Sequence, residues 1–332
     1  MSFLASIGLK PHAVVNDKAA MHSVRRLVQK LIQREYQEVG TILANAGDES
    51  RERLIYGFAT DERSVPLAAA WAVTMPRSSV AHTLLGASLI VTGWKARGNS
   101  YADDVDAGAW QPFLEGLENA EQPLHMAANL DPASADPWAW LIHAAFAQDA
   151  ARAELKRLFA EATSRTPLHW PSHYKYFNAT TQKWGGSHEE MFAFAHASAR
   201  SAPRASVIHC LVPAAYNDYA LALGRRSHER IRTKKSAAEI CGALYAWLNT
   251  DAAGLDRRLE RLSGGFSSYG LNHFAVACYL CGAHADAKAL LQALHGEIES
   301  TPWVWIASGL RERTDPAFVH DRVCRELGVA ER

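Results

Sequence analysis

The stretch YGLNHFAVACYLCGAHADAKALLQALHGEIESTP, residues 269–302, decides the fold class. It contains two apolar patterns at helical spacing, separated by a turn at Gly282. Phe274 and Cys278 lie on one face of the first predicted helix, and Leu291 lies on a face of the second. Pro302 then opens the next helix, where a proline is tolerated at the first position. A helix pair of this length is typical of a tetratricopeptide repeat.

Units of similar length recur along the chain. One runs from Trp138 to Pro167 and another from Pro171 to Pro203. A further one, between Leu85 and Pro132, is interrupted by an insertion over 94–113. Small residues at the helix crossings let two helices approach, and larger ones fill the groove between neighbouring pairs. The sequence therefore predicts an all-α, tetratricopeptide-like helical-repeat solenoid of stacked helix pairs, with atypical end pairs. The alternative is an irregular helical bundle.

Helix starts are marked by residues that favour the first turn. A capping residue precedes a proline in three pairs: Asp136-Pro137, Thr301-Pro302 and Asp315-Pro316. Such pairs place a side-chain acceptor before a residue whose missing N–H costs nothing. Ser187 with Glu190 three residues later predicts a capping box.

The bulk composition excludes several classes. The 332 residues have a formal net charge of zero, with 48% hydrophobic and 21% charged residues. These values exclude a disordered tail protein, a collagen-like chain and a nucleic-acid binder that relies on bulk positive charge. The apolar stretches 66–75 and 80–94 predict buried helices, because the first is too short to span a bilayer and the second contains polar and glycine residues.

The location of the protein is predicted from its ends and its cysteines. Residues 1–10 show neither a basic start nor a long apolar segment, so we expect no secretory signal. Five cysteines, an odd number, fit reduced thiols in a cytoplasmic protein. We expect three regions: N-terminal capping helices over 1–65, repeats with the inserted loop over 66–224, and C-terminal repeats with a cap over 225–332.

Several stretches resemble one narrower family. They are Trp71 and Pro76, then Trp94-Lys95-Ala96-Arg97-Gly98, Tyr101-Ala102-Asp103, Trp110, Phe113, Leu130-Asp131-Pro132, Lys183-Trp184-Gly185-Gly186-Ser187, Glu190-Met191 and Phe194-Ala195. Together they resemble a bacterial tetratricopeptide-like family catalogued as domain of unknown function number 4034, over roughly 25–220. The resemblance implies a helical-repeat fold and carries no activity.

The first candidate site is a groove on the concave face of the solenoid. Helical spacing places Lys175, Tyr176, Gln182 and Lys183 on the inner face of one predicted helix, with Arg97 nearby. Two ammonium groups beside a tyrosine suit an acidic peptide or a C-terminal carboxylate. The alternative, which we favour for the lysines themselves, is a solvated face. Trp184 is expected to pack at the turn between two helices.

The second candidate site lies under the insertion. Its polar residues stand between two tryptophans, and long loops are often functional. Here Arg97 would hold an anion, with Tyr101, Asp103 and His188 completing a small-ligand or catalytic site. The alternative, which we favour, is that Arg97 pairs with Asp103 or Asp104 and fixes the loop.

Motifs for metal binding and catalysis are weak. Cys278 and Cys281 form a single Cys-x-x-Cys pair, and zinc needs four ligands, so we expect a structural role for both. His169 and His173 are four apart, but Pro171 lies between them. No nucleophile, phosphate-binding or His-Glu-x-x-His motif occurs. We therefore expect no cofactor, no metal and no catalytic residue, although the sequence leaves enzyme activity open.

A basic stretch lies near the middle of the chain. Six cations occur within eleven residues: Arg225, Arg226, Arg230, Arg232, Lys234 and Lys235. It is either a docking patch for an acidic partner or a solvated linker between two lobes, and we favour the linker. Aromatic residues that stack on bases are absent here, so nucleic acid is not the expected partner.

The sequence thus predicts a non-catalytic scaffold that binds a protein or peptide, with self-association as a further possibility. The alternative function is a small-ligand-binding protein or enzyme with its site under the 94–113 loop. No membrane partner is expected.

Overall fold

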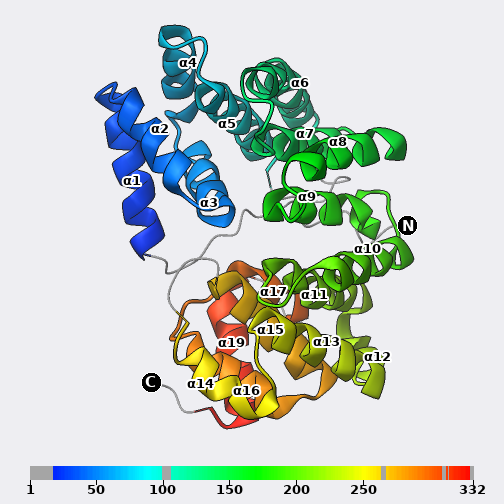
Figure 1. Ribbon diagram of the computed structural model, residues 1–332. Helices are drawn as coiled ribbons and strands as arrows, with labels where there is room; N and C mark the ends of the chain where they lie inside the picture. Colours follow the sequence, from blue (N-terminus) through cyan, green and yellow to red (C-terminus); the bar gives the residue numbers. More distant parts are fainter. Residues whose placement is uncertain (1–17, 99–105, 263–266, 309–311, 313, 330–332) are drawn as a thin grey trace. The chain divides into compact units, whose positions relative to one another are not determined.

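The computed structural model describes residues 18–98, 106–262, 267–308, 312 and 314–329. Every regular element within these ranges is a helix, and no β-strand occurs in them, so the all-α prediction is confirmed (Figure 1). No helix in the described part of the chain is both long enough and apolar enough to span a membrane. The predictions for residues 1–10 lie outside the described residues.

The chain forms two compact units, and each is described by itself. The N-terminal unit ends at Gly186, and the C-terminal unit begins at Ser187. This division differs from the predicted boundaries at 65/66 and 224/225. It falls within the turn of the unit predicted over 171–203, so the two helices of that unit belong to different compact units.

The N-terminal unit consists of nine described α-helices and one short 3-10 helix. They are α1 (Lys18–Ile32), α2 (Tyr36–Asn45), α3 (Asp48–Ala59), α4 (Ser64–Thr74), α5 (Ser79–Arg97), α6 (Ala107–Leu130), α7 (Asp136–Ala147), α8 (Arg152–Arg165), α9 (Trp170–Thr180) and η2 (Gln182–Trp184). Helices α4 and α5 cover the two apolar stretches that predicted buried helices.

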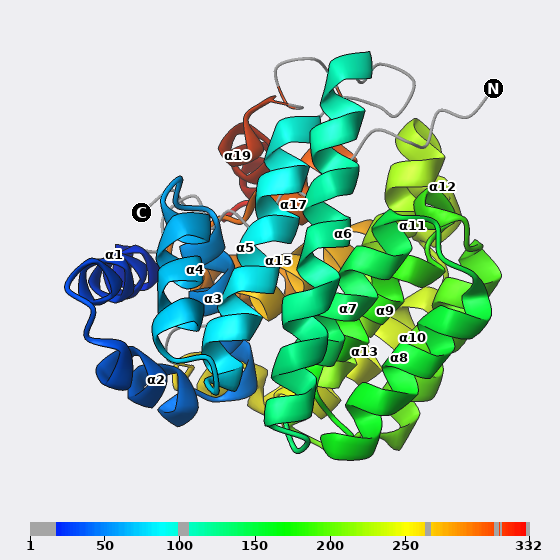
Figure 2. The same ribbon diagram turned by 90° about the horizontal axis from the view of Figure 1, so that it is seen from above.

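Helix packing in this unit alternates between an inner and an outer row. Helix α5 packs on α3 and α7, α7 packs on α9, and α9 in turn contacts α3. Helices α4, α6 and α8 follow the inner helices along the chain and pack outside them, as the view in Figure 2 shows for α4, α5, α6 and α7. The contact between α9 and α3 brings residues far apart in sequence together, and this contact positions the site described below.

Helices α5 and α6 form a long hairpin because glycines lie where they cross. A Cβ atom on Gly93 would stand 2.9 Å from the carbonyl oxygen of Phe113, and one on Gly116 would stand 2.9 Å from that of Leu89. The two backbones are therefore in direct contact. Both described ends of the insertion predicted over 94–113 are helical, because α5 continues to Arg97 and α6 begins at residue 107.

The predicted helix starts are only partly as expected. The hydroxyl of Ser187 accepts from the backbone N–H of Glu190 at 3.0 Å, and the carboxylate of Asp315 caps α19. Asp136 instead lies inside α7, whose capping residue is Ala135. Its carboxylate is therefore available for contacts with other helices. In the third pair, Thr301 has a non-helical backbone conformation within the short α17, so it does not act as a helix cap.

The C-terminal unit has shorter helices. They are α10 (His188–Ser201), η3 (Val207–Cys210), α11 (Leu211–Leu223), η4 (Gly224–Arg226), α12 (Ser227–Ile231), α13 (Lys234–Trp247), η5 (Ala252–Gly254), α14 (Leu255–Leu259), α15 (Ser267–Cys281), α16 (His284–Ala293), α17 (Ser300–Trp303), η6 (Val304–Ile306) and α19 (Pro316–Leu327). The predicted helix pair over 269–302 is seen as α15 and α16, joined at Gly282.

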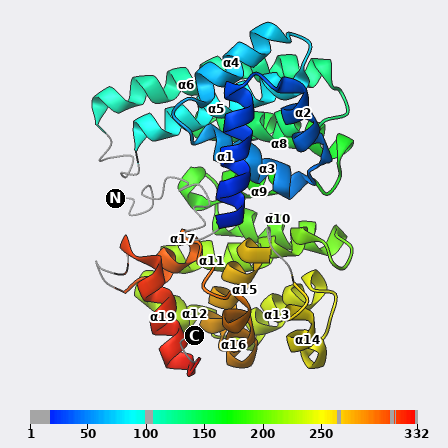
Figure 3. The same ribbon diagram turned by 90° about the vertical axis from the view of Figure 1, so that its left-hand side faces the viewer.

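Helix α15 is the centre of this unit. It is buried from Ser268 to Cys281 and packs against α11, α13 and α16 (Figure 3). The basic stretch predicted as a linker lies inside the unit instead. It forms η4, α12 and the start of α13, and α12 packs on both α11 and α15. The linker interpretation is therefore wrong for this stretch.

Candidate functional site

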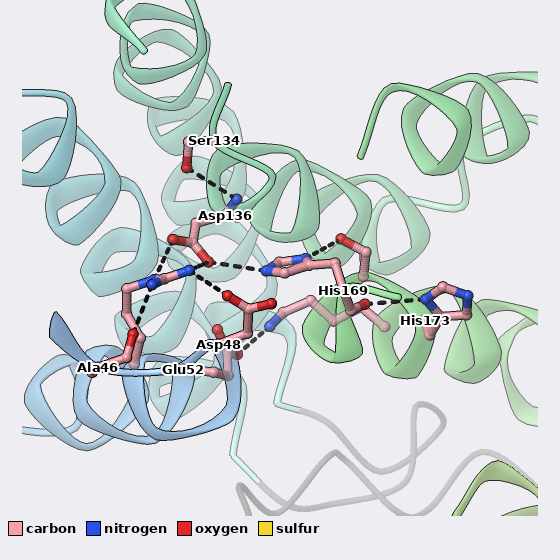
Figure 4. Close-up of polar contacts among 10 residues, drawn as sticks. Ala46, Asp48, Glu52, Ser134, Asp136, His169 and His173 are labelled. Atoms are coloured by element: carbon pink, nitrogen blue, oxygen red, sulfur yellow. Dashed lines mark hydrogen bonds and ion pairs between the residues drawn. The ribbon is translucent and has the colours of Figure 1, made fainter. Parts of the chain in front are cut away.

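A buried network of charged side chains joins three helices of the N-terminal unit (Figure 4). The carboxylate of Asp136, on α7, accepts from Arg51 Nε on α3 at 2.6 Å. It also contacts Nε2 of His169, the residue that precedes α9, at 3.1 Å. Arg51 donates further to Asp48 at 2.7 Å. Because the carboxylate of Asp136 is nearly enclosed, it needs these partners to remain charged.

The hydrogen bonds fix the tautomer of His169. The ion pairs and hydrogen bonds of Asp136 keep its pKa below the usual value, against the opposing effect of burial. The carboxylate is therefore ionised and can only accept hydrogen bonds. Nε2 of His169 therefore carries the proton toward Asp136. When the ring is neutral, Nδ1 is an acceptor, and Ser172 Oγ, which lies 2.7 Å away, donates to it. The result is a relay from Ser172 through His169 to Asp136.

This relay has the residue types of an acyl-transfer triad but not the access that such a triad needs. Ser172 is 0% exposed and His169 is 1% exposed. A nucleophile must be within reach of the bond that it attacks. We therefore assign the relay a structural role: it ties the start of α9 to α7, and through Arg51 to α3.

A second ion pair joins α9 to α3 beside the first. Lys175 Nζ donates to the carboxylate of Glu52, and the same ammonium lies 4.2 Å from the centre of the Trp140 ring. Lys175 is 6% exposed, so it does not line an open groove as predicted. The helix that carries it is buried on nearly all sides, because α9 packs against α3, α7 and α8 together.

Among the other predicted groove residues, one is buried and two are at least partly exposed. Tyr176 is buried and its ring stacks on Phe159 at 4.5 Å between centroids. Gln182 is exposed and Lys183 is half-buried, in the 3-10 helix that follows α9. The predicted cationic groove is therefore not formed, since two of its residues face the interior.

Aromatic rings extend from Trp140 toward the end of α5. His143 stacks on Trp140 at 5.7 Å and on Phe146 at 5.1 Å. Trp184 meets Phe146 at 5.2 Å and Trp94 at 5.4 Å, both edge-on. We call these five residues the aromatic cluster. Trp184 thus packs at an inter-helix turn, as predicted from the sequence.

The turn that places Trp184 depends on the two glycines that follow it. Gly185 has a φ of +76°, in the left-handed region that favours glycine. A Cβ on Gly186 would lie 2.0 Å from the carbonyl oxygen of Thr180, which leaves no room for a side chain. Arg152 also donates to the carbonyl of Trp184 at 3.3 Å. The Trp-Gly-Gly sequence therefore has a physical reason here.

The aromatic cluster contains several buried nitrogen atoms without a hydrogen-bond partner. They are Nε1 of Trp94, Trp140 and Trp184, and both ring nitrogens of His143. Burial lowers the pKa of His143 well below its usual value, and the nearby charge of Lys175 adds to this effect. His143 is therefore neutral. Buried polar atoms are nearly always paired in folded proteins, so five unpaired atoms in one cluster need an explanation.

Arg97 borders the cluster on the side of α5. Its guanidinium lies 5.5 Å from the ring centre of Trp94, 5.3 Å from that of Trp110 and 5.9 Å from that of Phe113. Burial lowers the pKa of Arg97. It is 6% exposed, so the predicted open anion holder is instead a cation enclosed by rings.

The other residues named with Arg97 in the sequence analysis are Tyr101, Asp103, Asp104 and His188. Tyr101, Asp103 and Asp104 lie outside the described residues. His188 belongs to the C-terminal unit, where its ring meets Tyr219 edge-on at 4.9 Å.

Sequence reasoning did not select Arg51, Glu52, Asp136 or His143. The sequence pattern favours Asp136 as a helix cap, whereas its contacts come from helices distant in sequence. The spacing of His169 and His173 suits one helix face, but the proline between them argues against a shared face. That proline lies in the first turn of α9, where it does not interrupt the helix.

Acid is expected to destabilise this unit through His173. Burial lowers the pKa of His173 to about 4, while its unfolded value is near 6.5. Between these values the unfolded chain binds a proton and the folded chain does not, so stability falls as the pH falls from about 6.5 to 4. The shift corresponds to about 3 kcal/mol.

Chemical denaturation across this pH range should show a smaller loss of the free energy of unfolding for His173→Gln than for the wild type. The exposed His125→Gln serves as control, and an equal loss in all three proteins would contradict the assignment.

Comparisons with protein-family models, curated proteins and solved structures found no match to this chain. The resemblance to the tetratricopeptide-like family therefore rests on the sequence motifs alone. Fold and site together define an all-helical protein whose N-terminal unit encloses a charged network and an aromatic cluster.

Proposed function

We propose that the N-terminal unit binds a small planar molecule that carries a carboxylate or carbonyl group, at the edge of the aromatic cluster. The observation that carries the proposal is the set of unpaired buried nitrogens on Trp94, Trp140, His143 and Trp184. An indole N–H only donates, so the complement of three such groups is an acceptor. The sequence analysis gave a ligand-binding protein as the alternative function, with its site under the 94–113 loop. The present proposal keeps that function and places the site among the helices.

The charges around the cluster support an anionic ligand. Arg97 lies over Trp94 and Lys175 lies over Trp140, so a cation borders the cluster at each of these rings. A carboxylate near either cation gains a charge-assisted contact in a region that water reaches poorly. Apolar rings with a few polar atoms are the usual lining of small-molecule sites. No catalytic residue is proposed, because Ser172 is enclosed.

The proposal is tested with the full chain in two stages. Native mass spectrometry first looks for a molecule that co-purifies with the protein. A panel of aromatic carboxylates, benzoate and indole-3-acetate among them, is then titrated by tryptophan fluorescence. Trp184→Phe removes one N–H and keeps a ring, and we expect it to weaken binding at least tenfold, which corresponds to the loss of one hydrogen bond. Trp71→Phe is the matched control, since it removes a buried unpaired N–H outside the cluster.

If the aromatic cluster binds no ligand, the expected effect of Trp184→Phe is different. The substitution then removes an unsatisfied donor and leaves the protein as stable as the wild type or more stable. No adduct, no saturable binding and an unchanged or higher melting temperature for Trp184→Phe would together overturn the proposal.

A second proposed function is a scaffold that binds an acidic protein or peptide through the C-terminal unit. It is supported by the six cations of the basic stretch, which are all exposed: Arg225, Arg226, Arg230, Arg232, Lys234 and Lys235. This proposal includes the tetratricopeptide-like arrangement and a cytoplasmic location. Binding of a poly-glutamate peptide that weakens with salt and with Arg226→Glu would support it. Equal binding by Arg226→Glu, or a preference for single-stranded nucleic acid, would count against it.

A further inference from the structure

Three thiols and a carboxylate meet in the C-terminal unit, at some distance in sequence from one another. Cys241 lies in the middle of α13, Cys278 and Cys281 lie in the last turn of α15, and Asp286 lies in the first turn of α16. The sequence alone drew attention only to the Cys-x-x-Cys pair, which lacks the four ligands of a zinc site. The tertiary structure supplies the other two.

The turn between α15 and α16 brings Asp286 back over the cysteines. The backbone N–H of Ala283 donates to the carbonyl of Cys278 at 2.9 Å, which closes the end of α15. Helix α16 then begins at His284, so Asp286 lies one short turn further on. The Cys241 thiol reaches the same place from α13, which packs against α15.

The distances suit a single metal ion. The ligand atoms of Cys241, Cys278 and Asp286 all lie within 4.8 Å of one another. A tetrahedral zinc ion with Zn–S bonds of about 2.3 Å holds its ligand atoms about 3.8 Å apart, so a contraction of about 1 Å completes the site. Cys281 lies one turn after Cys278 on the same helix, and its thiol donates to the carbonyl of Cys278 at 3.4 Å. As the fourth donor of the proposed site, this thiol turns from the carbonyl toward the ion.

Asp286 has the surroundings of a metal ligand and lacks those of an ion pair. Its Oδ2 accepts from the hydroxyl of Tyr245 at 2.8 Å, a contact that orients the carboxylate as outer partners of metal ligands do. The side chain is half-buried, and the ion pairs formed by the described side chains do not include it.

We propose that Cys241, Cys278, Cys281 and Asp286 bind one zinc ion, which ties α13 to the hairpin of α15 and α16. All four positions are filled by protein, so the site is structural and leaves no open position for a substrate. Thiolates favour zinc, cobalt and cadmium over magnesium or calcium. This proposal is independent of the ligand site proposed for the N-terminal unit.

The test uses the full chain without an affinity tag, reduced and stripped of metal by a chelator. Zinc is titrated in competition with a chromophoric chelator, and cobalt is titrated by absorption. We expect one equivalent of zinc, a thiolate-to-cobalt charge-transfer band, and the release of about three protons per zinc, because three thiols must deprotonate. Cys241→Ser and Asp286→Asn should each weaken zinc binding at least tenfold.

Cys210→Ser is the matched control, since Cys210 is a buried thiol of the same unit outside the cluster. It should bind zinc as the wild type does. Circular dichroism verifies that each variant is folded, and zinc should raise the melting temperature of the wild type and of Cys210→Ser only. Zinc binding that is equal in Cys241→Ser and wild type, or no binding by the folded wild type, would overturn the proposal.

Discussion

Replacing Asp136 by alanine is expected to lower the free energy of unfolding by about 3–5 kcal/mol, the range found when one partner of a buried ion pair is removed. The variant leaves Arg51 and His169 without their shared acceptor, and His169 is 1% exposed, so water cannot replace the carboxylate. Chemical denaturation of wild type and variant at pH 7 measures the difference.

The matched control is Glu154→Ala, which breaks an exposed ion pair with Arg157 on α8. Exposed pairs contribute little, so its stability should stay close to that of the wild type. The pKa of Asp136 is lowered in the folded state, so its contribution is present above the unfolded pKa of about 4 and is lost as the pH falls through the folded value. Equal stability of Asp136→Ala and Glu154→Ala at pH 7 would contradict the role assigned to Asp136.

Reversing the charge of Lys175 is the second large effect. Lys175→Glu replaces an enclosed ion pair by two carboxylates, that of Glu52 and the new one, and it also removes the cation over Trp140. We expect a loss of at least about 4 kcal/mol, because breaking a buried pair and adding a like charge act together. Thermal and chemical denaturation of the full chain provide the measurement.

A charge reversal at Glu52 distinguishes the loss of the ion pair from a general loss of packing. Glu52→Lys combined with Lys175→Glu restores opposite charges, so the double variant should recover a large part of the lost stability. Lys183→Glu, at a half-buried position of η2, is the single-variant control and should change stability little. A double variant as unstable as the sum of the two single ones would show that charge is not the cause.

These variants also change how a partner-binding test should be designed. From the sequence, joint charge reversal of Lys175 and Lys183 would have been the natural test of a cationic groove. In the structure, Lys175 holds α9 to α3, so lost binding in such a variant would follow from unfolding. The exposed cations of α12 and its neighbours, Arg226 among them, are the positions at which charge reversal reports on a partner.

Local features of the chain were predictable from the sequence because they depend on neighbours a few residues away. The helix pairs of 138–167 and 269–302, the cap at Ser187 and the packing role of Trp184 follow from spacing, side-chain acceptors and glycine. Each is decided within one or two helical turns, where propensity and capping act. The same reasoning placed the helices around the insertion but ended the first too early and began the second too late.

The site depends on contacts that no local pattern encodes. Asp136 meets Arg51 across 85 positions, and Lys175 meets Glu52 across 123. Whether a lysine faces water or a buried carboxylate is decided only when the inner helices pack and α9 reaches α3. By itself the sequence determined an all-helical chain, its helix pairs and several of their ends. The tertiary structure decided which charges are enclosed, which nitrogens lack partners and which cysteines meet, because burial depends on distant segments.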